Sequence, residues 1–216
     1  MSDFIRVSIE GWYVMVPLFL GSIMALAICV EKAFHLSRAQ ADPARLMSKV
    51  KEAVRKRDYR VAVGYCEATP GPVAKVLATT IDLRTLPDEQ IKQGVEEAVL
   101  TEIPRLERFL PTLSTIITLS PLLGLLGTVT GLMKVFSKFA FESNPVPAML
   151  AGGIKEALYT TALGLAIAIV FYFLNNIIST RIDNLINQME KSVVELLNFM
   201  RLEGNHDAEL QTSKQN

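Results

Sequence analysis

The sequence is poor in the residues that build disulfide-linked or metal-binding proteins. Its 216 residues include only two cysteines, Cys29 and Cys66, and two histidines, His35 and His206. One cysteine lies in an apolar segment and the other in a polar one, which indicates no disulfide framework, and the set gives no zinc or haem signature. The sequence also lacks a Walker loop, a GxSxG motif and an HExxH motif. We therefore predict a protein that is not an enzyme and that uses neither a metal nor another cofactor.

Charge is missing from three long stretches, although Lys plus Arg and Asp plus Glu total 22 each. The uncharged stretches cover residues 12–30, 109–133 and 157–180. A helix rises about 1.5 Å per residue, so each stretch can cross a hydrocarbon core of roughly 30 Å. The first is not typical of a signal peptide, because only Arg6 precedes it and no small-residue cleavage site follows it. We predict an all-α integral membrane protein with transmembrane helices at 12–30, 109–136 and 152–180.

The basic residues near the span ends predict the orientation. On one side lie Lys32, Arg38, Arg45, Lys49, Lys92, Arg105, Arg108 and Arg181; on the other lie Arg6, Lys134, Lys138 and Lys155. Because the side richer in Lys and Arg is normally cytoplasmic, residues 1–11 and the loop 137–151 are expected outside. The region 31–108 and the C-terminal segment are expected in the cytoplasm.

The polar region 31–108 is typical of a group of helices. Asp42-Pro43 indicates a helix start, two prolines around Gly71 indicate a break, and "LPDEQIKQGVEEAVLTEI" begins with acidic residues that suit a helix N-terminus. The basic run 55–57 has no aromatic platform beside it. We interpret it as a solvated helix end or a contact with anionic lipid headgroups, and we predict no nucleic-acid partner.

The third span is predicted to continue as a cytoplasmic helix over 181–204. Apolar residues spaced three and four apart form a seam made of Ile182, Ile186, Met189, Val193, Leu196 and Met200. Such a seam packs on another helix, which can belong to the same chain, to another subunit, or to both. Gly204 is the predicted helix end, and 205–216 is predicted to be a loose tail.

Spans two and three each carry a face of small residues. The stretch "PLLGLLGTVTGLMKVF", residues 121–136, contains three glycines and two threonines. The residues of the two faces are Ser120, Gly124, Gly127 and Gly131 in span two, and Gly153, Ala157, Thr160, Thr161, Gly164 and Ala168 in span three. Small residues let helix backbones approach closely. Two interpretations stay open: ordinary packing, with hydroxyls bonded to their own helices, or a face turned towards something other than lipid.

Glu156 bears on this choice because it stands near the start of span three. A carboxylate there can be held at the membrane interface by the helix dipole, with Lys155 beside it. Alternatively, it lies below the headgroups and faces a wet cavity, with Thr160 one turn away. An ionisable group at membrane depth is a functional candidate. A carboxylate with a few hydroxyls suits proton or ion passage, although one chain would need a partner carboxylate.

"PLLGLLGTVTGLMKVF" followed by "GGIKEALYTTALGLAIAI" resembles the paired signature of the ExbB/TolQ/MotA proton-channel family. "VMVPLFLGSIMALAICVEKAFHL" and "AVGYCEATPGPVAKVL" resemble the first helix and the cytoplasmic region of the family, so the resemblance covers nearly the whole chain. Three spans with a large cytoplasmic loop are similar to the ExbB/TolQ branch. The runner-up is the MotA-type stator, whose members have four spans and a longer chain.

The resemblance implies a homopentameric ring in the bacterial inner membrane, with the N-terminus periplasmic and the C-terminus cytoplasmic. It also implies a dimer of an ExbD/TolR-like single-span partner in the pore, whose Asp carries protons that drive periplasmic work. By motif, the pore threonines fall on Thr128 and Thr161, and the glutamate falls on Glu156. Thr160 is a second candidate for the third-span hydroxyl.

Thr128 and Thr161 each lie about eight residues, or roughly 12 Å, from the outer ends of their spans, so they are expected to form one polar girdle. Gly124, Gly127, Gly131 and Gly164 are expected to form the small face around the partner helix. A passive membrane scaffold without ion passage is the alternative from another functional class. Nutrient uptake, envelope constriction and motility all remain open as the powered process, and so does the choice between H⁺ and Na⁺.

Overall fold

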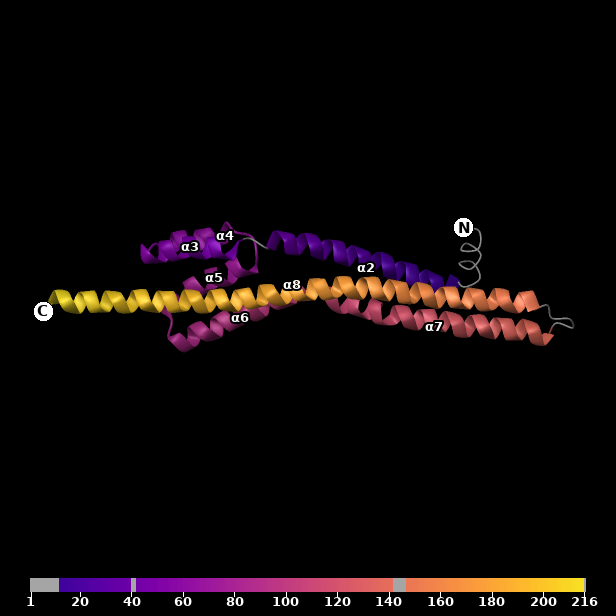
Figure 1. Ribbon diagram of the computed structural model, residues 1–216. Coiled ribbons are helices and arrows are strands. Elements are labelled where there is room, and N and C mark those ends of the chain that lie inside the picture. The colour runs from indigo at the N-terminus through magenta and orange to yellow at the C-terminus, as the bar shows by residue number, and fades with distance from the viewer. Residues whose placement is uncertain (1–11, 40–41, 142–146, 216) are drawn as a thin grey trace. The chain divides into compact units, whose positions relative to one another are not determined.

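The computed structural model describes residues 12–39, 42–141 and 147–215, and every regular element in these ranges is a helix (Figure 1). The elements are α2 (Trp12–Ala39), α3 (Pro43–Arg55), α4 (Tyr59–Glu67), α5 (Pro72–Asp82), the 3₁₀ turn η1 (Leu83–Thr85), α6 (Asp88–Glu107), α7 (Leu110–Phe141) and α8 (Pro147–Gln215). Three of the described helical stretches are long and apolar enough to cross a membrane. The predictions of an all-α chain and of three such helices are confirmed. The predicted external segment 1–11 lies outside the described residues.

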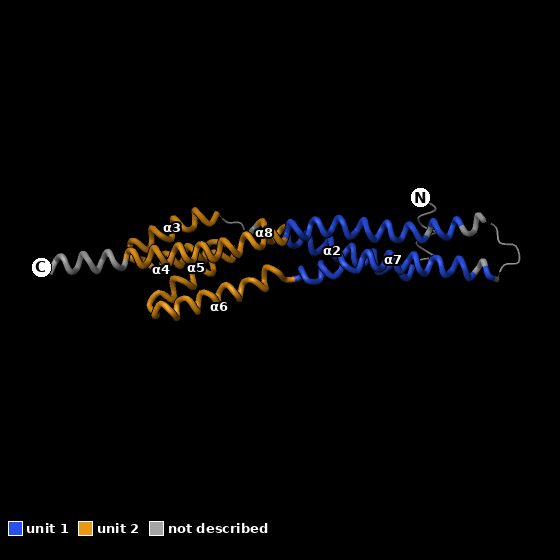
Figure 2. The backbone as a smooth tube through the Cα atoms, turned by 60° about the horizontal axis from the view of Figure 1, so that its bottom comes forward, with its two compact units in different colours: residues 1–32, 109–178 blue, residues 33–108, 179–216 orange. Residues whose placement is uncertain are grey.

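The helices divide into two compact units, shown in different colours in Figure 2. Unit 1 consists of residues 1–32 and 109–178, and unit 2 of residues 33–108 and 179–216. The helix α8 contributes residues to both units. Unit 1 holds the three apolar stretches, and unit 2 holds the polar helices.

Unit 1 has an interior of small and branched residues and an apolar exterior. Val14, Ala25, Leu113 and Ala157 are almost fully buried. Large apolar side chains on its surface are exposed: Phe19, Leu20, Ile23, Leu122, Leu125, Val129, Ile169, Tyr172 and Phe173. A soluble domain seldom exposes so much continuous apolar surface. This unit is therefore built to face hydrocarbon.

Unit 2 is a bundle whose core includes the predicted cytoplasmic seam. Ile182, Met189, Val193 and Leu196 are at most 5% exposed within the single chain. Ion pairs hold the same segment from two sides: the Nζ of Lys51 in α3 lies 2.6 Å from the carboxylate of Glu195, and Arg201 lies 2.6 Å from Asp88 in α6. The seam thus packs on helices of its own chain, which is one of the possibilities that the sequence leaves open.

Local sequence signals fix several helix ends in unit 2. The carboxylate of Asp42 accepts hydrogen bonds from the backbone N–H groups of Ala44 and Arg45 at 3.1 and 3.3 Å, so the predicted N-cap before Pro43 is confirmed. Gly71 has φ 131°, a conformation that favours glycine, and it separates α4 from α5 as expected.

The predicted helix end at Gly204 differs from the structure, in which α8 continues to Gln215. A glycine inside a helix costs only about 0.5–1 kcal/mol, which alone does not end it. At the end that the sequence predicts to be external, α7 runs on to Phe141 and α8 begins at Pro147, so both helices extend into the predicted loop 137–151.

Candidate membrane site between α7 and α8

The small residues of α7 and α8 lie against one another within unit 1. A Cβ added to Gly124 would lie 2.9 Å from the Cα of Thr161, and one added to Gly164 would lie 2.5 Å from the carbonyl oxygen of Ser120. A Cβ on Gly131 would lie 3.1 Å from the Cβ of Ala157. These distances leave no room for a side chain at the contact. The glycine face is therefore occupied by the neighbouring helix of the same chain.

Gly127 provides the space for Thr160. A Cβ on Gly127 would overlap the Oγ1 of Thr160 and would lie 2.7 Å from its Cβ. The Thr160 side chain is only 3% exposed, and its hydroxyl donates to the carbonyl of Ala157 at 2.7 Å, with the carbonyl of Gly124 at 3.4 Å. Thr160 is thus enclosed in the packing between the helices.

Thr161 makes the principal hydrogen bond between the two helices at this level. Its hydroxyl donates to the backbone carbonyl of Gly124 over 2.9 Å, and its side chain is half-buried. In an α-helix the carbonyl of residue i accepts the amide N–H of residue i+4. The Gly124 carbonyl therefore accepts hydrogen bonds from both the Thr128 amide and the Thr161 hydroxyl.

Thr128 lies one helical turn from Gly124 on α7. Its hydroxyl donates to the carbonyl of Leu125 over 2.7 Å, and its side chain is half-exposed. Such bonds to the same helix satisfy a hydroxyl in an apolar environment. The oxygen keeps its acceptor capacity, so Thr128 can still bind a donor that approaches from outside the α7–α8 pair.

Pro121 and Ser120 modify the backbone of α7 just before the glycines. Pro121 lacks an N–H and so leaves the carbonyl of Ile117 without its helical donor. The hydroxyl of Ser120 donates to the neighbouring carbonyl of Ile116 over 2.7 Å, and Ser120 is only 3% exposed. The proline that opens the motif thus stands in a continuous helix.

A polar contact that the sequence did not predict joins α2 to α7. The hydroxyl of Tyr13 donates to the hydroxyl of Thr130 over 2.9 Å, and the Nζ of Lys134 lies 4.7 Å from the centre of the Tyr13 ring. A tyrosine at the start of a span is normally assigned to the membrane interface. The sequence contains no signal that pairs it with Thr130.

The predicted acid, Glu156, lies in α8 immediately before the buried Ala157. Its side chain lies outside the described part of the structure, so its role stays a prediction. The described groups of the α7–α8 contact are hydroxyls, backbone carbonyls and apolar atoms. Within the described residues, no group of three or more His, Cys, Asp or Glu side chains could hold a metal ion.

Comparisons with known proteins place the chain in a family. The model described as the MotA/TolQ/ExbB proton channel family matches residues 68–191, which is more than half of the chain and includes the α7–α8 contact. The chain belongs to the MotA/TolQ/ExbB proton channel family. The resemblance that the paired motifs predicted is confirmed, and with it the assignment to membrane proteins.

Members of the MotA/TolQ/ExbB family from several bacteria are similar over different lengths. The biopolymer transport protein ExbB-like 3 of Synechocystis sp. is 34% identical over 169 residues, covering 77% of this chain and 80% of the relative. The Tol-Pal system protein TolQ of Pseudomonas aeruginosa is 38% identical over 100 residues, covering 46% and 43%. The biopolymer transport protein ExbB of Pseudomonas putida is 28% identical over 194 residues, covering 85% and 58%.

Proposed function

We propose that this chain is the proton-channel subunit of a bacterial inner-membrane motor. In this proposal it couples the proton motive force to work in the periplasm or at the outer membrane, through an ExbD/TolR-like single-span partner. The N-terminus would lie in the periplasm and unit 2 in the cytoplasm. Family membership, the apolar exterior of unit 1 and the distribution of Lys and Arg support the proposal.

The observation that carries the proposal is the shared carbonyl of Gly124. The Thr161 hydroxyl binds it directly at 2.9 Å, and Thr128 follows one turn later on the same helix. Two hydroxyls from different helices thus lie within about one helical turn of each other along α7, inside an apolar unit. Of the two third-span candidates, the half-buried Thr161 suits a pore better than Thr160, which is 3% exposed.

The chemistry proposed for this pair is the support of a partner carboxyl group. In the single chain both hydroxyl protons are donated to helix carbonyls, so the hydroxyl oxygens can accept the proton of a neutral Asp. Burial raises the pKa of that Asp, and a hydroxyl that turns from its carbonyl to donate to the carboxylate lowers it again. An Asp balanced in this way can take up a proton from one side and release it to the other. Moving one charge through 100 mV supplies about 2.3 kcal/mol, which is enough to bias a conformational step.

The glycines have a different task in this proposal from the one the sequence indicated. They set the separation of α7 and α8 within one chain and so position the two hydroxyls. We propose that a ring of five copies surrounds the partner helices and that Glu156 stands at the outer entrance. A passive scaffold, which the following experiment tests, and a MotA-like stator are the alternatives.

The test is proton flux into liposomes that contain the chain together with its partner. Thr128→Val and Thr161→Val keep the side-chain shape but remove the hydroxyl, so both are expected to reduce flux by tenfold or more in an assembled complex. The matched control is Thr115→Val, because Thr115 also lies on α7 with its hydroxyl bonded to its own helix, at the carbonyl of Pro111.

If the two test variants conduct as well as the parent, the hydroxyl pair is not the pathway. If the parent itself conducts no ions with a functional partner, the protein is a passive scaffold and the channel proposal is wrong. A flux that follows a sodium gradient and not a proton gradient would contradict the proposed ion. The same liposomes therefore test both the residues and the function.

A further inference from the structure

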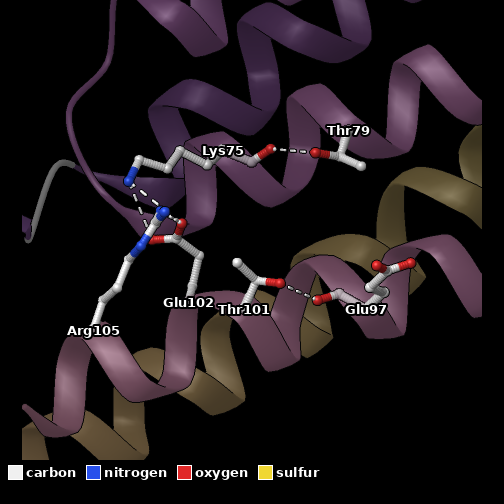
Figure 3. Close-up of polar contacts among 6 residues, drawn as sticks. All are labelled: Lys75, Thr79, Glu97, Thr101, Glu102 and Arg105. Atoms are coloured by element: carbon white, nitrogen blue, oxygen red, sulfur yellow. Dashed lines mark hydrogen bonds and ion pairs between the residues drawn. The ribbon is translucent and has the colours of Figure 1, made fainter.

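A buried carboxylate in unit 2 gathers two cations from separate helices (Figure 3). The Nζ of Lys75 in α5 lies 3.2 and 3.4 Å from the two carboxylate oxygens of Glu102 in α6. The Nη1 of Arg105, one turn further along α6, also donates to this carboxylate. The side chain of Glu102 is 10% exposed, whereas those of Lys75 and Arg105 are 59% and 61% exposed.

The cluster carries more positive charge than its carboxylate neutralises. Two cations share one anion, so the group has a formal charge of +1. A lysine ammonium has three donors and an arginine guanidinium has five, and the described contacts of both side chains are all with Glu102. The hydroxyls of Thr79 and Thr101 nearby donate to their own helix carbonyls. The remaining cation donors therefore face the solvent.

The cluster is tied to the membrane by the covalent chain. Arg105 precedes Leu110, the first residue of α7, by five residues, so its Cα lies within about 18 Å of the Leu110 Cα. The uncharged stretch begins at Phe109. The headgroup layer adds roughly 5–7 Å beyond the hydrocarbon on each side, and long basic side chains extend towards that layer. This chain length is an upper limit on the separation, and it allows the Arg105 side chain to reach the headgroups.

We propose that Lys75 and Arg105, positioned by Glu102, bind the phosphate of an anionic phospholipid headgroup. Glu102 holds the ammonium and the guanidinium side by side, which removes part of the cost of ordering two long side chains on binding. A guanidinium matches two oxygens of one phosphate, and a lysine adds a compact charge. The site would recognise a phosphodiester with a net negative charge in the leaflet beside unit 2.

The position of the cluster favours a lipid over a soluble anion. A free phosphate would use the same donors, but the link from Arg105 to α7 is only five residues long, and anionic headgroups are concentrated at the membrane surface. An acidic protein segment is the other class of occupant. It would be expected to bring apolar anchors as well, because desolvated apolar contacts carry most of the affinity at protein interfaces.

The experiment measures lipid retention by the full chain in detergent, using native mass spectrometry after exposure to equal amounts of phosphatidylglycerol and phosphatidylcholine. The parent is expected to retain phosphatidylglycerol preferentially. Lys75→Gln and Arg105→Gln are each expected to reduce that preference about fivefold, the factor that corresponds to about 1 kcal/mol per basic residue at an anionic surface. Each single variant leaves the other cation on Glu102, so the carboxylate stays paired.

The matched control is Lys56→Gln, which removes the same charge from an exposed lysine that is paired with Glu52 in another part of unit 2. An equal loss in the control would show a general charge effect and overturn the site. An unchanged preference in both test variants would overturn it as well. If a glutamine variant does not fold, Lys75→Arg and Arg105→Lys replace it. Lys75→Arg is expected to keep the preference and Arg105→Lys to weaken it, because lysine cannot match two phosphate oxygens; the reverse result contradicts the proposal.

Competition distinguishes the possible occupants. Inorganic phosphate at constant ionic strength is expected to leave phosphatidylglycerol bound to the parent. If phosphate displaces the lipid completely, the site belongs to a soluble anion and the lipid proposal is wrong. If the parent prefers neither lipid but an acidic peptide binds and is lost in Arg105→Gln, a protein partner replaces the lipid. None of these results depends on proton flux, so the proposed function stands or falls separately.

Discussion

Replacing Gly124 with alanine tests how strictly the contact between α7 and α8 depends on a missing side chain. The new Cβ would lie 2.9 Å from the Cα of Thr161 and 3.0 Å from the carbonyl oxygen of Thr160. Both neighbours are backbone atoms, which cannot rotate away. Because carbon atoms pack at about 3.5–4.0 Å, the helices have to separate by roughly 0.6 Å or more at this level.

The separation has a cost that can be worked from the structure. The hydrogen bond from Thr161 to the Gly124 carbonyl, now 2.9 Å long, would stretch to about 3.5 Å and be lost. Hydrogen bonds between membrane helices contribute about 0.6 kcal/mol and at most about 1.7, and overpacking adds about 1–3 kcal/mol. Alanine recovers about 0.5–1 kcal/mol of helix propensity. We expect Gly124→Ala to lower the free energy of unfolding by about 1–3 kcal/mol.

The assay is thermal unfolding in detergent followed by circular dichroism, with Gly152→Ala as the matched control. A Cβ on Gly152 in α8 would meet no atom within 4 Å, so only the propensity gain of about 0.5–1 kcal/mol is expected there. The two variants should therefore shift the melting temperature in opposite directions. If Gly124→Ala melts at or above the temperature of Gly152→Ala, the close approach of the helices is not what the glycine provides.

Two further predictions concern unit 2. Arg57 follows α3 with φ 58°, a backbone conformation in which glycine carries no steric penalty. Arg57→Gly should therefore raise the free energy of unfolding by about 1 kcal/mol, measured by a circular-dichroism melt. An unchanged or lower melting temperature would contradict this. Burial, with smaller contributions from Asp82 and Glu67, raises the pKa of Cys66 from 9.0 to about 11, so iodoacetamide at pH 8 should label this thiol slowly in the folded chain and quickly after unfolding. Since the folded pKa is raised, the stability contributed by this group is complete below about pH 9 and is lost as the pH rises towards 11; rapid labelling of the folded chain at pH 8 would contradict the assignment.

Much of the fold could be predicted from the sequence because membranes and helix caps impose simple rules. Uncharged stretches of sufficient length predict the three apolar helices, Asp42 before Pro43 predicts the start of α3, and Gly71 predicts a break. These signals depend on a few neighbouring residues and need no knowledge of distant contacts. The end of α8 was not predictable in this way, because a lone glycine weakens a helix without ending it.

The site could be predicted only in part. The motif predicted that Thr128, Thr161 and the glycines lie on two helices. It did not predict which surface each residue faces. The choice between Thr160 and Thr161 depends on the rotation of α8 against α7, which adjacent positions in a sequence do not specify. The Tyr13–Thr130 and Lys75–Glu102 contacts join residues that are distant in sequence, so no local pattern predicts them. Only the Glu102–Arg105 pair, three residues apart on α6, has a local spacing.

The packing of Gly124, Gly127 and Gly131 against α8 shows that residues that build the helix pair differ from residues that could select a partner. The contact forms within one chain, so these glycines serve the architecture and say little about a partner. Under the proposed function, specificity for a single-span partner would then be encoded elsewhere on the two helices. The exposed Leu122 and Val129 of α7 are positions at which relatives can diverge, and exchanging them between paralogues should change partner choice without changing the fold.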